Sequence, residues 1–348
     1  MKKVWREGET VKKVFALFSL LLVFCLLLVT GCSSQKADSE KKAGPKVMKL
    51  GIVTNKDRSL TQGLVKFGEI VEKESGGSIK AEVFSDGVLG GDRQVIEALQ
   101  MGTVHGTAVS TGVVAAFAPR MDAFDLPFLF KDKATAYKVF DGPIGQEVLK
   151  DLPKAGLIGF SYWENGFRHL TNNKREVKTA EDIKGLKIRT LESKVHVETW
   201  KTLGANPTPI AYTQLYSAME QGVVDGQENP LGNVVGMKFN EVQKYLTTTG
   251  HIYNANVFLI SKKFFDSLTD KEKEIVTKAA EEAKEYQRKL NDKEDNDSIA
   301  ILKEKGMKIS ELNAGEKEKM QQVLQPVYQQ VSTAIGGDFV DRLLAATK

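Results

Sequence analysis

The chain has 348 residues and a formal net charge of +4, with only two cysteines and four histidines. A length of this order is typical of two domains, and 41% hydrophobic with 27% charged residues is the composition of a globular protein. These values exclude a wholly disordered chain, which could not supply so many core residues. Two cysteines also exclude a fold held together by several disulfides.

Most of the positive charge lies at the N-terminus. The first 31 residues carry five basic and two acidic side chains, a net charge of +3. The remaining residues carry a net charge of only +1, so the rest of the chain is nearly neutral. Any preference of this protein for anions must therefore be local.

The same N-terminal segment has the pattern of an export signal. Residues 14–29 are apolar except for Ser19 and follow a basic head, but they are slightly short for a transmembrane helix. Residues 28–32 (LVTGC) resemble a lipoprotein signal. We predict a cleaved signal peptide over 1–31, lipid on Cys32 and a flexible tether over 32–46. The protein would then be exported and lipid-anchored at the outer face of the cell membrane, periplasmic or extracellular; the alternative is an uncleaved anchor.

Short strands and helices alternate in the first half of the chain. Strands are predicted over 47–53, 79–84 and 106–109, and helices over 60–74 and from Asp92 to residue 99. Such alternation favours an α/β fold with a mostly parallel sheet.

The alternation returns later and then gives way to helices. Strands are predicted over 157–162, 186–189, 223–225 and 256–260, with helices over 193–203 and 212–221. Thr269 and Glu272 form a capping box before a helix of 20 residues or more. The C-terminal residues 316–348 are predicted to form a helical tail. We predict two α/β lobes followed by a helical C-terminal segment.

The sequence lacks the patterns of catalysis. The four histidines are too dispersed for a metal site, and no G-x-S-x-G nucleophile elbow occurs. Residues 87–91 (GVLGG) are rich in glycine but match neither a phosphate loop nor a dinucleotide fingerprint, so they are interpreted as a turn. We therefore predict a protein that is not an enzyme and uses no metal or cofactor; an exported enzyme acting on small acids is the alternative.

Two arginines stand out by their position. Arg168 lies just past a predicted strand, and Arg189 ends another. Ligands of open α/β sheets bind beyond the carboxyl ends of the strands, and the planar guanidinium can grip a carboxylate through two parallel hydrogen bonds. The alternative for either arginine is an ordinary surface charge.

Several motifs carry a family resemblance that runs from about residue 47 to the C-terminus. They are 86–93 (DGVLGGDR), 126–129 (LPFL), 165–172 (NGFRHLTN), 183–189 (IKGLKIR), 203–209 (LGANPTP) and 224–230 (VDGQENP). In this order and spacing, the chain resembles solute-binding proteins of TRAP (tripartite ATP-independent periplasmic) transporters, the DctP family.

The resemblance implies a periplasmic-binding-protein-like fold of two lobes, with strand hinges, a long bridging helix and a ligand cleft between the lobes. Lobe I would comprise 47–165 and 255–294, and lobe II 166–254 and 295–348. A monomer would capture a small organic acid anion and deliver it to TRAP permease subunits driven by an ion gradient, with no nucleic-acid partner.

The resemblance also implies the binding residues. Arg189 would be the selectivity-filter arginine that pairs with the ligand carboxylate, with Arg168 as a second arginine and Asn229 as an amide donor. Tyr212 would form an aromatic wall. The remaining candidates are Trp163 (a second wall or a core residue), Thr54 and Ser110 from lobe I, and His196 (facing the cleft or the surface).

The resemblance leaves the ligand open between two classes. A C4-dicarboxylate is favoured slightly, and a sugar acid (uronate or aldonate) is the alternative. A third possibility is a ligand-sensing lipoprotein that presents its closed form to a receptor kinase.

Overall fold

The computed structural model describes residues 44–348. The predicted signal peptide, Cys32 and nearly all of the predicted tether lie outside the described residues. The tether prediction ends slightly too late, because Lys46 already belongs to the first strand, β1 (Lys46–Gly51). Within residues 44–348, no helix combines the length and the apolar character needed to cross a bilayer.

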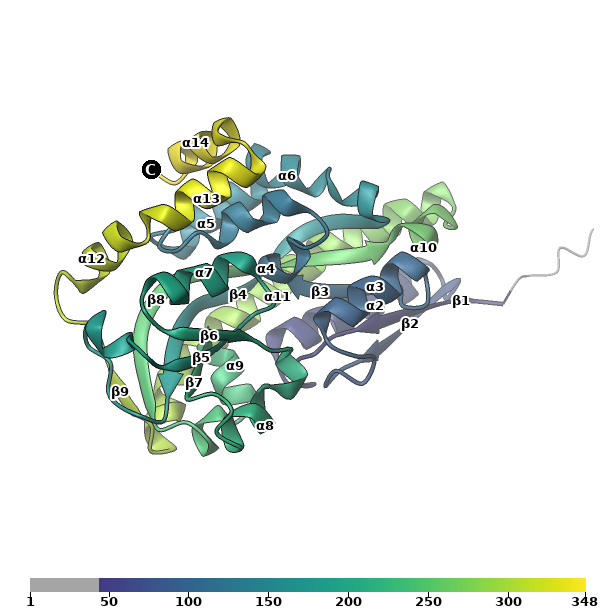
Figure 1. Cartoon of the computed structure of the whole chain (residues 1–348). Helices are drawn as coiled ribbons and strands as arrows, with labels where there is room; N and C mark the ends of the chain where they lie inside the picture. The colour runs from purple at the N-terminus through teal and green to yellow at the C-terminus, as the bar shows by residue number, and fades with distance from the viewer. Residues whose placement is uncertain (1–43) are drawn as a thin grey trace, which may run out of the picture. The chain divides into compact units, whose positions relative to one another are not determined.

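The strands of the described part form one mixed sheet of nine strands (Figure 1). Its order is β2-β1-β3-β8-β4-β7-β5-β6, and β9 pairs with β8. The first half contributes β2 (Ile79–Phe84) and β3 (Gly106–Ser110), and the others are β4 (Leu157–Asn172), β5 (Lys187–Thr190), β6 (Asn206–Pro209), β7 (Gly226–Pro230), β8 (Tyr245–Ser261) and β9 (Lys308–Ser310).

The antiparallel pair β4 and β8 connects two groups of parallel strands. One end of β8 pairs with β3, where Ser110 lies opposite Asn256, and the far end of β4 pairs with β7, where Arg168 lies opposite Pro230. Between these ends the β4–β8 register shifts at residues 164–166, and Gly166 has φ of +114°. The predicted two-lobed α/β fold with strand hinges is confirmed.

The sequence misplaced three strand boundaries. β4 continues ten residues beyond the predicted end at 162, so Arg168 lies inside a strand and not past its end. β8 begins at Tyr245, well before the predicted start at 256. The predicted strand over 223–225 lies too early, because β7 begins at Gly226.

The long bridging helix is α11 (Asp270–Glu304), which has 35 residues and therefore spans roughly 50 Å. It begins with the predicted capping box of Thr269 and Glu272 and packs against β4, α2 (Ser59–Glu74) and α9 (Leu231–Gly236). The other helices are α3 (Asp92–Met101), α4 (Thr111–Val114), α5 (Lys133–Asp141), α6 (Pro143–Leu149), α7 (Lys194–Thr202), α8 (Leu215–Glu220), α10 (Lys262–Asp266), α12 (Glu316–Val323), α13 (Gln325–Ile335) and α14 (Gly337–Ala346).

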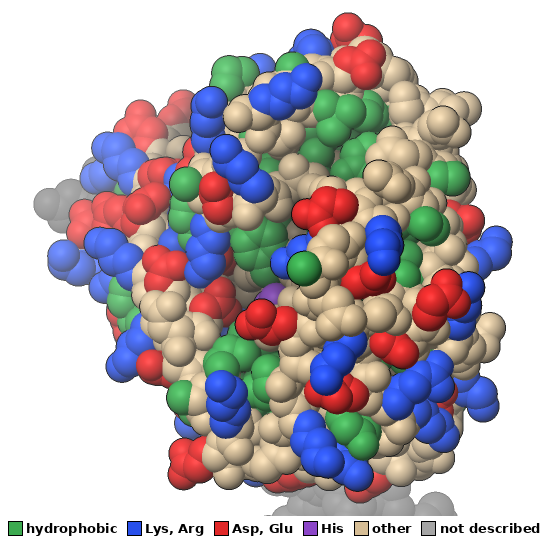
Figure 2. Space-filling view, turned by 90° about the vertical axis from the view of Figure 1, so that its left-hand side faces the viewer, with side chains coloured by type: hydrophobic (Ala, Val, Ile, Leu, Met, Phe, Trp, Pro, Cys, Tyr) green, Lys and Arg blue, Asp and Glu red, His purple; other side chains and the backbone are tan. Residues whose placement is uncertain are grey.

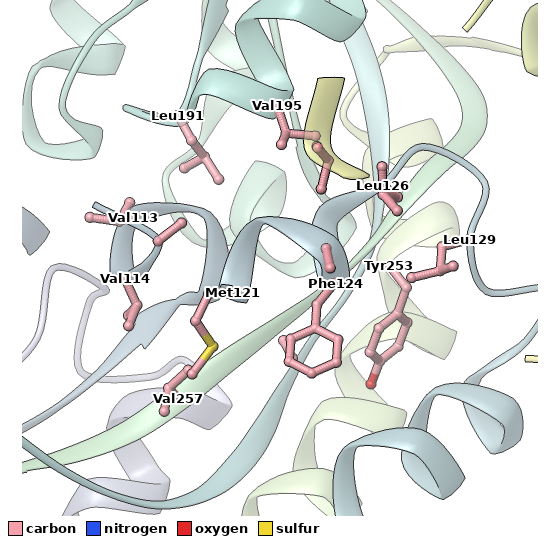
Figure 3. Packing of buried hydrophobic residues seen from close by; sticks show 14 of the residues in the cluster. Val113, Val114, Met121, Phe124, Leu126, Leu129, Leu191, Val195, Tyr253 and Val257 are labelled. Carbon is pink, nitrogen blue, oxygen red and sulfur yellow. The ribbon is translucent and has the colours of Figure 1, made fainter. Parts of the chain in front are cut away.

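The largest apolar cluster joins elements from both halves of the sheet. It contains Phe124 of the 3-10 helix η1 (Pro119–Asp125), Val113 of α4 and Val195 of α7 (Figure 3). Helix α13 of the C-terminal segment packs on η1 and on α7 as well. Burial of such side chains provides most of the driving force for folding, so this cluster holds η1 and α7 together.

Candidate binding site

A small cavity of about 30 Å³ lies where the two groups of parallel strands meet β4 and β8. Five of the eight candidate residues line it: Thr54, Ser110, Arg168, Tyr212 and Asn229. Most of the candidates predicted from the sequence therefore lie close together in the folded protein, although they come from positions as far apart in the chain as 54 and 229.

Two larger hollows lie elsewhere and contain none of the predicted binding residues. One, of about 570 Å³, lies beside α11. The other, of about 810 Å³, lies between residues 311–321 and the middle of β4 and β8. Figure 2 shows this hollowed face, where hydrophobic side chains and charges of both signs surround a histidine. We place the candidate site in the smaller cavity because its lining alone combines the predicted arginine with a set of convergent amides.

Arg168 is fully buried, and its charge already has a partner. Its Nε and Nη2 both donate to the Glu228 carboxylate, with Nη2 2.9 Å from Oε1, and its Nη1 donates to Asn254 Oδ1 at 3.0 Å. Burial opposes ionisation of Glu228, but the charges of Arg168 and His196 outweigh it and hold the pKa of that carboxyl well below its usual range. Arg168 therefore belongs to a balanced ion pair at the cavity wall.

Arg189 is buried and has no such partner. It is 1% exposed, its Nε donates to the Ile210 carbonyl at 2.7 Å, and its Nη1 has no hydrogen-bond acceptor within the described residues. No carboxylate of residues 44–348 lies within ion-pair distance of it. Burial and the nearby charge of Arg168 lower the pKa of Arg189 to about 10, so it stays cationic at neutral pH.

Arg189 does not itself line the cavity, but it is near two residues that do. Its charge acts on the titrating groups of Asp92 and Tyr212, both of which are lining residues. The Tyr212 hydroxyl is buried and has no hydrogen-bond partner in the described part of the chain. A cation without a carboxylate partner and a hydroxyl without a hydrogen-bond partner in residues 44–348 therefore act on each other beside the cavity.

Asparagines supply most of the remaining polar lining. Asn254 accepts hydrogen bonds from Arg168 and Asn165 and donates to Ser110 Oγ at 2.8 Å. Asn229, the predicted amide donor, donates to Gln227 and accepts from Asn233 at 3.0 Å. The Asn229 amide thus has one N–H hydrogen left for another acceptor.

Asp92 and four lining asparagines were missed by the sequence analysis. Asp92 was predicted only as the start of a helix; it is the first residue of α3 and also lines the cavity. Burial raises the pKa of this carboxyl to about 7, against the opposing charge of Arg189. Asn254 and Asn256 are two apart in β8 and so share a face, a signal that could have been found; the missed asparagines are Asn165, Asn233, Asn254 and Asn256.

Trp163 lies in the core and not in the cavity lining. It stacks on Phe258 with ring centroids 4.9 Å apart, and it is fully buried. The structure thus places it at the core position that the sequence analysis had left open. His196 occupies neither of its two predicted positions, since it is fully buried and contacts Asp125 and Glu228.

Comparison with known proteins identifies the family. The model of the DctP family, described as bacterial extracellular solute-binding protein family 7, matches residues 50–334. A solute-binding protein of Verminephrobacter eiseniae is 38% identical over 87% of this chain and 90% of its own length. The chain therefore belongs to the DctP family of solute-binding proteins.

Two solved structures share the fold. The sugar acid binding protein DctPAm of Advenella mimigardefordensis, in complex with galactonate, has a TM-score of 0.85 and 40% identity, covering 87% of this chain and 98% of the other. A TRAP periplasmic solute-binding protein of Sulfurospirillum deleyianum with bound succinate has a TM-score of 0.84 and 34% identity, covering 87% and 100%. Both are binding proteins for organic acids.

Proposed function

We propose that this protein captures a small organic acid between two lobes and delivers it to the membrane permease of a TRAP transporter. The observation that carries the proposal is the buried guanidinium of Arg189, which has one hydrogen bond and no carboxylate partner among the described residues. An uncompensated buried charge is strongly unfavourable. A ligand carboxylate would supply the missing negative charge and the missing acceptor.

The two arginines then have different tasks. Arg189 provides the net charge, because the charge of Arg168 is already balanced by Glu228. Arg168 contributes the one N–H of its Nη1 that is not already donated, and Glu228 and Asn254 hold the guanidinium in place. Charge-assisted hydrogen bonds of this kind replace the water that a carboxylate loses on entering the site.

We further infer that the two lobes separate to admit the ligand. The lobe boundaries that we propose are those of the sequence analysis, and the β4–β8 register shift at residues 164–166 supports them. Ligand pockets commonly measure about 300–1,000 Å³, whereas this cavity measures about 30 Å³. The described conformation is therefore compact around the site, and closure would complete contacts from both lobes.

The lining favours a hydroxylated monocarboxylate, so we propose a sugar acid in preference to the C4-dicarboxylate favoured from the sequence. Apart from the two arginines, the polar groups of the site are amides, hydroxyls and Asp92. These groups suit the hydroxyls of an aldonate or uronate. A second ligand carboxylate would meet Asp92, whose own charge is already disfavoured by burial. The likeness to the galactonate-bound structure supports this choice.

Calorimetry with galactonate and succinate tests both levels of the proposal. We expect galactonate to bind more tightly, and Arg189→Ala to weaken binding by about 2–5 kcal/mol. Arg189→Lys should bind poorly as well, since it keeps the charge but loses the planar fork. Arg93→Ala is the matched control because Arg93 is an exposed arginine beside Asp92. Unchanged affinity in Arg189→Ala would refute the assigned role.

We also propose that lipid on Cys32 anchors the protein at the outer face of the cell membrane. The support is the sequence of residues 28–32, which follows a basic and apolar leader. Mass spectrometry of the mature protein should show an acylated Cys32 at the N-terminus. Cys32→Ser should release the protein from membranes; a mature chain that keeps residues 1–31 would contradict the proposal.

A further inference from the structure

A buried histidine connects two carboxylates that belong to different parts of the fold. His196 of α7 is fully buried, with Nε2 2.7 Å from Asp125 Oδ2 and Nδ1 3.4 Å from Glu228 Oε1. Neutral imidazole carries a single N–H and would turn a lone pair toward one of the two carboxylates. The doubly protonated ring donates to both, so the geometry favours the imidazolium.

The two carboxylates come from opposite sides of the proposed lobe boundary. Asp125 ends η1 in lobe I, and its other oxygen accepts a hydrogen bond from Thr111. His196 and Glu228 belong to lobe II. The contact is closely packed: a Cβ added to Gly112 would lie 2.5 Å from Asp125 Oδ2 and 3.1 Å from Ser193 Cβ.

Glu228 continues the connection to the ligand site. One of its oxygens faces His196, and the carboxylate as a whole holds Arg168, which lines the cavity. A line of contacts therefore runs from Asp125 through His196 and Glu228 to Arg168. We propose that the His196 imidazolium is a positioning residue that links lobe closure to the placement of Arg168, and that closure takes up a proton at this ring; this inference rests on the proposed function of the cavity.

The charges around His196 agree with this state. Asp122 and Asp125 approach from η1, Glu228 from β7, Arg168 from β4, and the neutral His251 from β8. Helix α7 itself contributes Lys194. Among the other elements that pack against α7, β5 carries Lys187 and Arg189. The remaining ones, α4, β6 and α13, carry no charged side chains. Burial opposes the charged ring, but Glu228 and Asp125 outweigh burial and raise the pKa of His196.

The expected pH dependence follows from the sign of this shift. If closure brings Asp125 to the ring, the pKa of His196 is higher in the closed state than in the open state. Binding is then strongest at pH values below the open-state pKa and weakens as the pH rises through the closed-state pKa. The loss can reach tenfold per pH unit for a single linked proton. Asp92 also titrates in the cavity, so variants must separate the two groups.

Calorimetry with galactonate in buffers of different ionisation enthalpy measures the proton uptake. At pH values between the open-state and the closed-state pKa of this ring, the wild type should take up more protons, up to one per bound galactonate, than His196→Gln, while Asp92 contributes equally to both. Asp125→Asn should move the midpoint of the pH profile to lower pH. His105→Gln, which changes a histidine outside the site, should leave uptake unchanged. Equal proton uptake by the wild type and His196→Gln would overturn the proposal.

Nitrogen-15 spectra of the imidazoles in the galactonate complex test directly whether His196 contacts Asp125 and Glu228 as an imidazolium. A doubly protonated ring at neutral pH should disappear in His196→Gln, and its midpoint should fall in Asp125→Asn. A singly protonated His196 in the galactonate complex at neutral pH would overturn the proposal. If neither galactonate nor succinate binds but the unliganded protein shows the doubly protonated ring, the proposed function of the cavity is wrong. The contact of the His196 imidazolium with Asp125 and Glu228 would then still be supported.

Discussion

The Arg168 guanidinium and the Glu228 carboxylate form an ion pair from which solvent is excluded, with Nη2 2.9 Å from Oε1. His251 donates to the same carboxylate through Nε2 at 3.1 Å. This arrangement holds Arg168 at the cavity wall before any ligand arrives. It also makes both charged residues dependent on each other for stability.

Glu228→Gln should therefore destabilise the protein by about 3–5 kcal/mol, because it leaves the charge of Arg168 buried without a counter-charge. Urea unfolding in the absence of ligand measures the change. Glu97→Gln is the control, because Glu97 pairs with Arg93 at the surface and exposed pairs contribute at most about 1 kcal/mol. A loss in Glu228→Gln no larger than in the control would contradict the buried pair.

Trp163 packs against the glycine Gly63 of α2, and this contact should tolerate no side chain. A Cβ on Gly63 would lie 2.6 Å from Cζ3 of the Trp163 ring, which stacks on Phe258 and cannot easily move. Gly63→Ala should cost about 1–3 kcal/mol through overpacking, measured by thermal or urea unfolding. Gly44→Ala, where a Cβ has nothing within 4 Å, should have little effect; equal stabilities would show that the tryptophan shifts freely.

Asp92 should make the unliganded protein less stable as the pH rises. The pKa of its carboxyl is raised to about 7 in the folded protein, above the usual value of about 3.9. The folded state therefore holds a proton that the unfolded state has already released, and stability falls between about pH 4 and about pH 7. Asp92→Asn should remove this loss and gain about 1 kcal/mol or more at pH 8 relative to pH 4.

The comparison of unfolding curves at both pH values is essential, because Asp92→Asn also changes helix α3 near its N-terminus. A carboxylate there interacts favourably with the helix dipole, and its loss alone would destabilise the variant most at high pH. A variant that becomes relatively less stable as the pH rises would therefore contradict the raised pKa.

The alternation of strands and helices was sufficient to predict the fold because most elements bury one apolar face. The prediction failed in β4 and β8, where buried polar residues interrupt the pattern. Asn254 and Asn256 lie inside β8 but face the cavity, and Gly166 interrupts β4 at the register shift. Binding residues in the middle of strands thus concealed those strands from an analysis based on hydrophobic spacing.

The arginines were found from the sequence, but their electrostatic roles were not. Arg168 pairs with Glu228, which lies 60 positions away along the chain, through the β4–β7 pairing. Arg189 has no ion-pair partner in residues 44–348, and its Nη1 has no hydrogen-bond acceptor there. Both facts depend on tertiary contacts. The sequence motifs, by contrast, predict the same role for both arginines, which is to bind a ligand carboxylate.

The Tyr212 hydroxyl offers a test that separates ligand binding from stability. It is buried and has no hydrogen-bond partner within the described residues, and an unsatisfied buried polar group costs about 1–3 kcal/mol. Tyr212→Phe should therefore leave the unliganded protein as stable as the wild type or more stable. If the ligand supplies the missing partner, the same change should weaken galactonate binding by about 1 kcal/mol.

Tyr162→Phe is the matched control, since the Tyr162 hydroxyl is equally buried but donates to the Gly145 carbonyl at 3.0 Å. That variant should lose about 1 kcal/mol of stability and keep its affinity for galactonate, because Tyr162 lies in the apolar core and not at the cavity. The two variants should thus have opposite effects in urea unfolding and in calorimetry. Parallel losses of stability would show that the Tyr212 hydroxyl has a structural partner, and an unchanged affinity in Tyr212→Phe would remove this hydroxyl from the binding site.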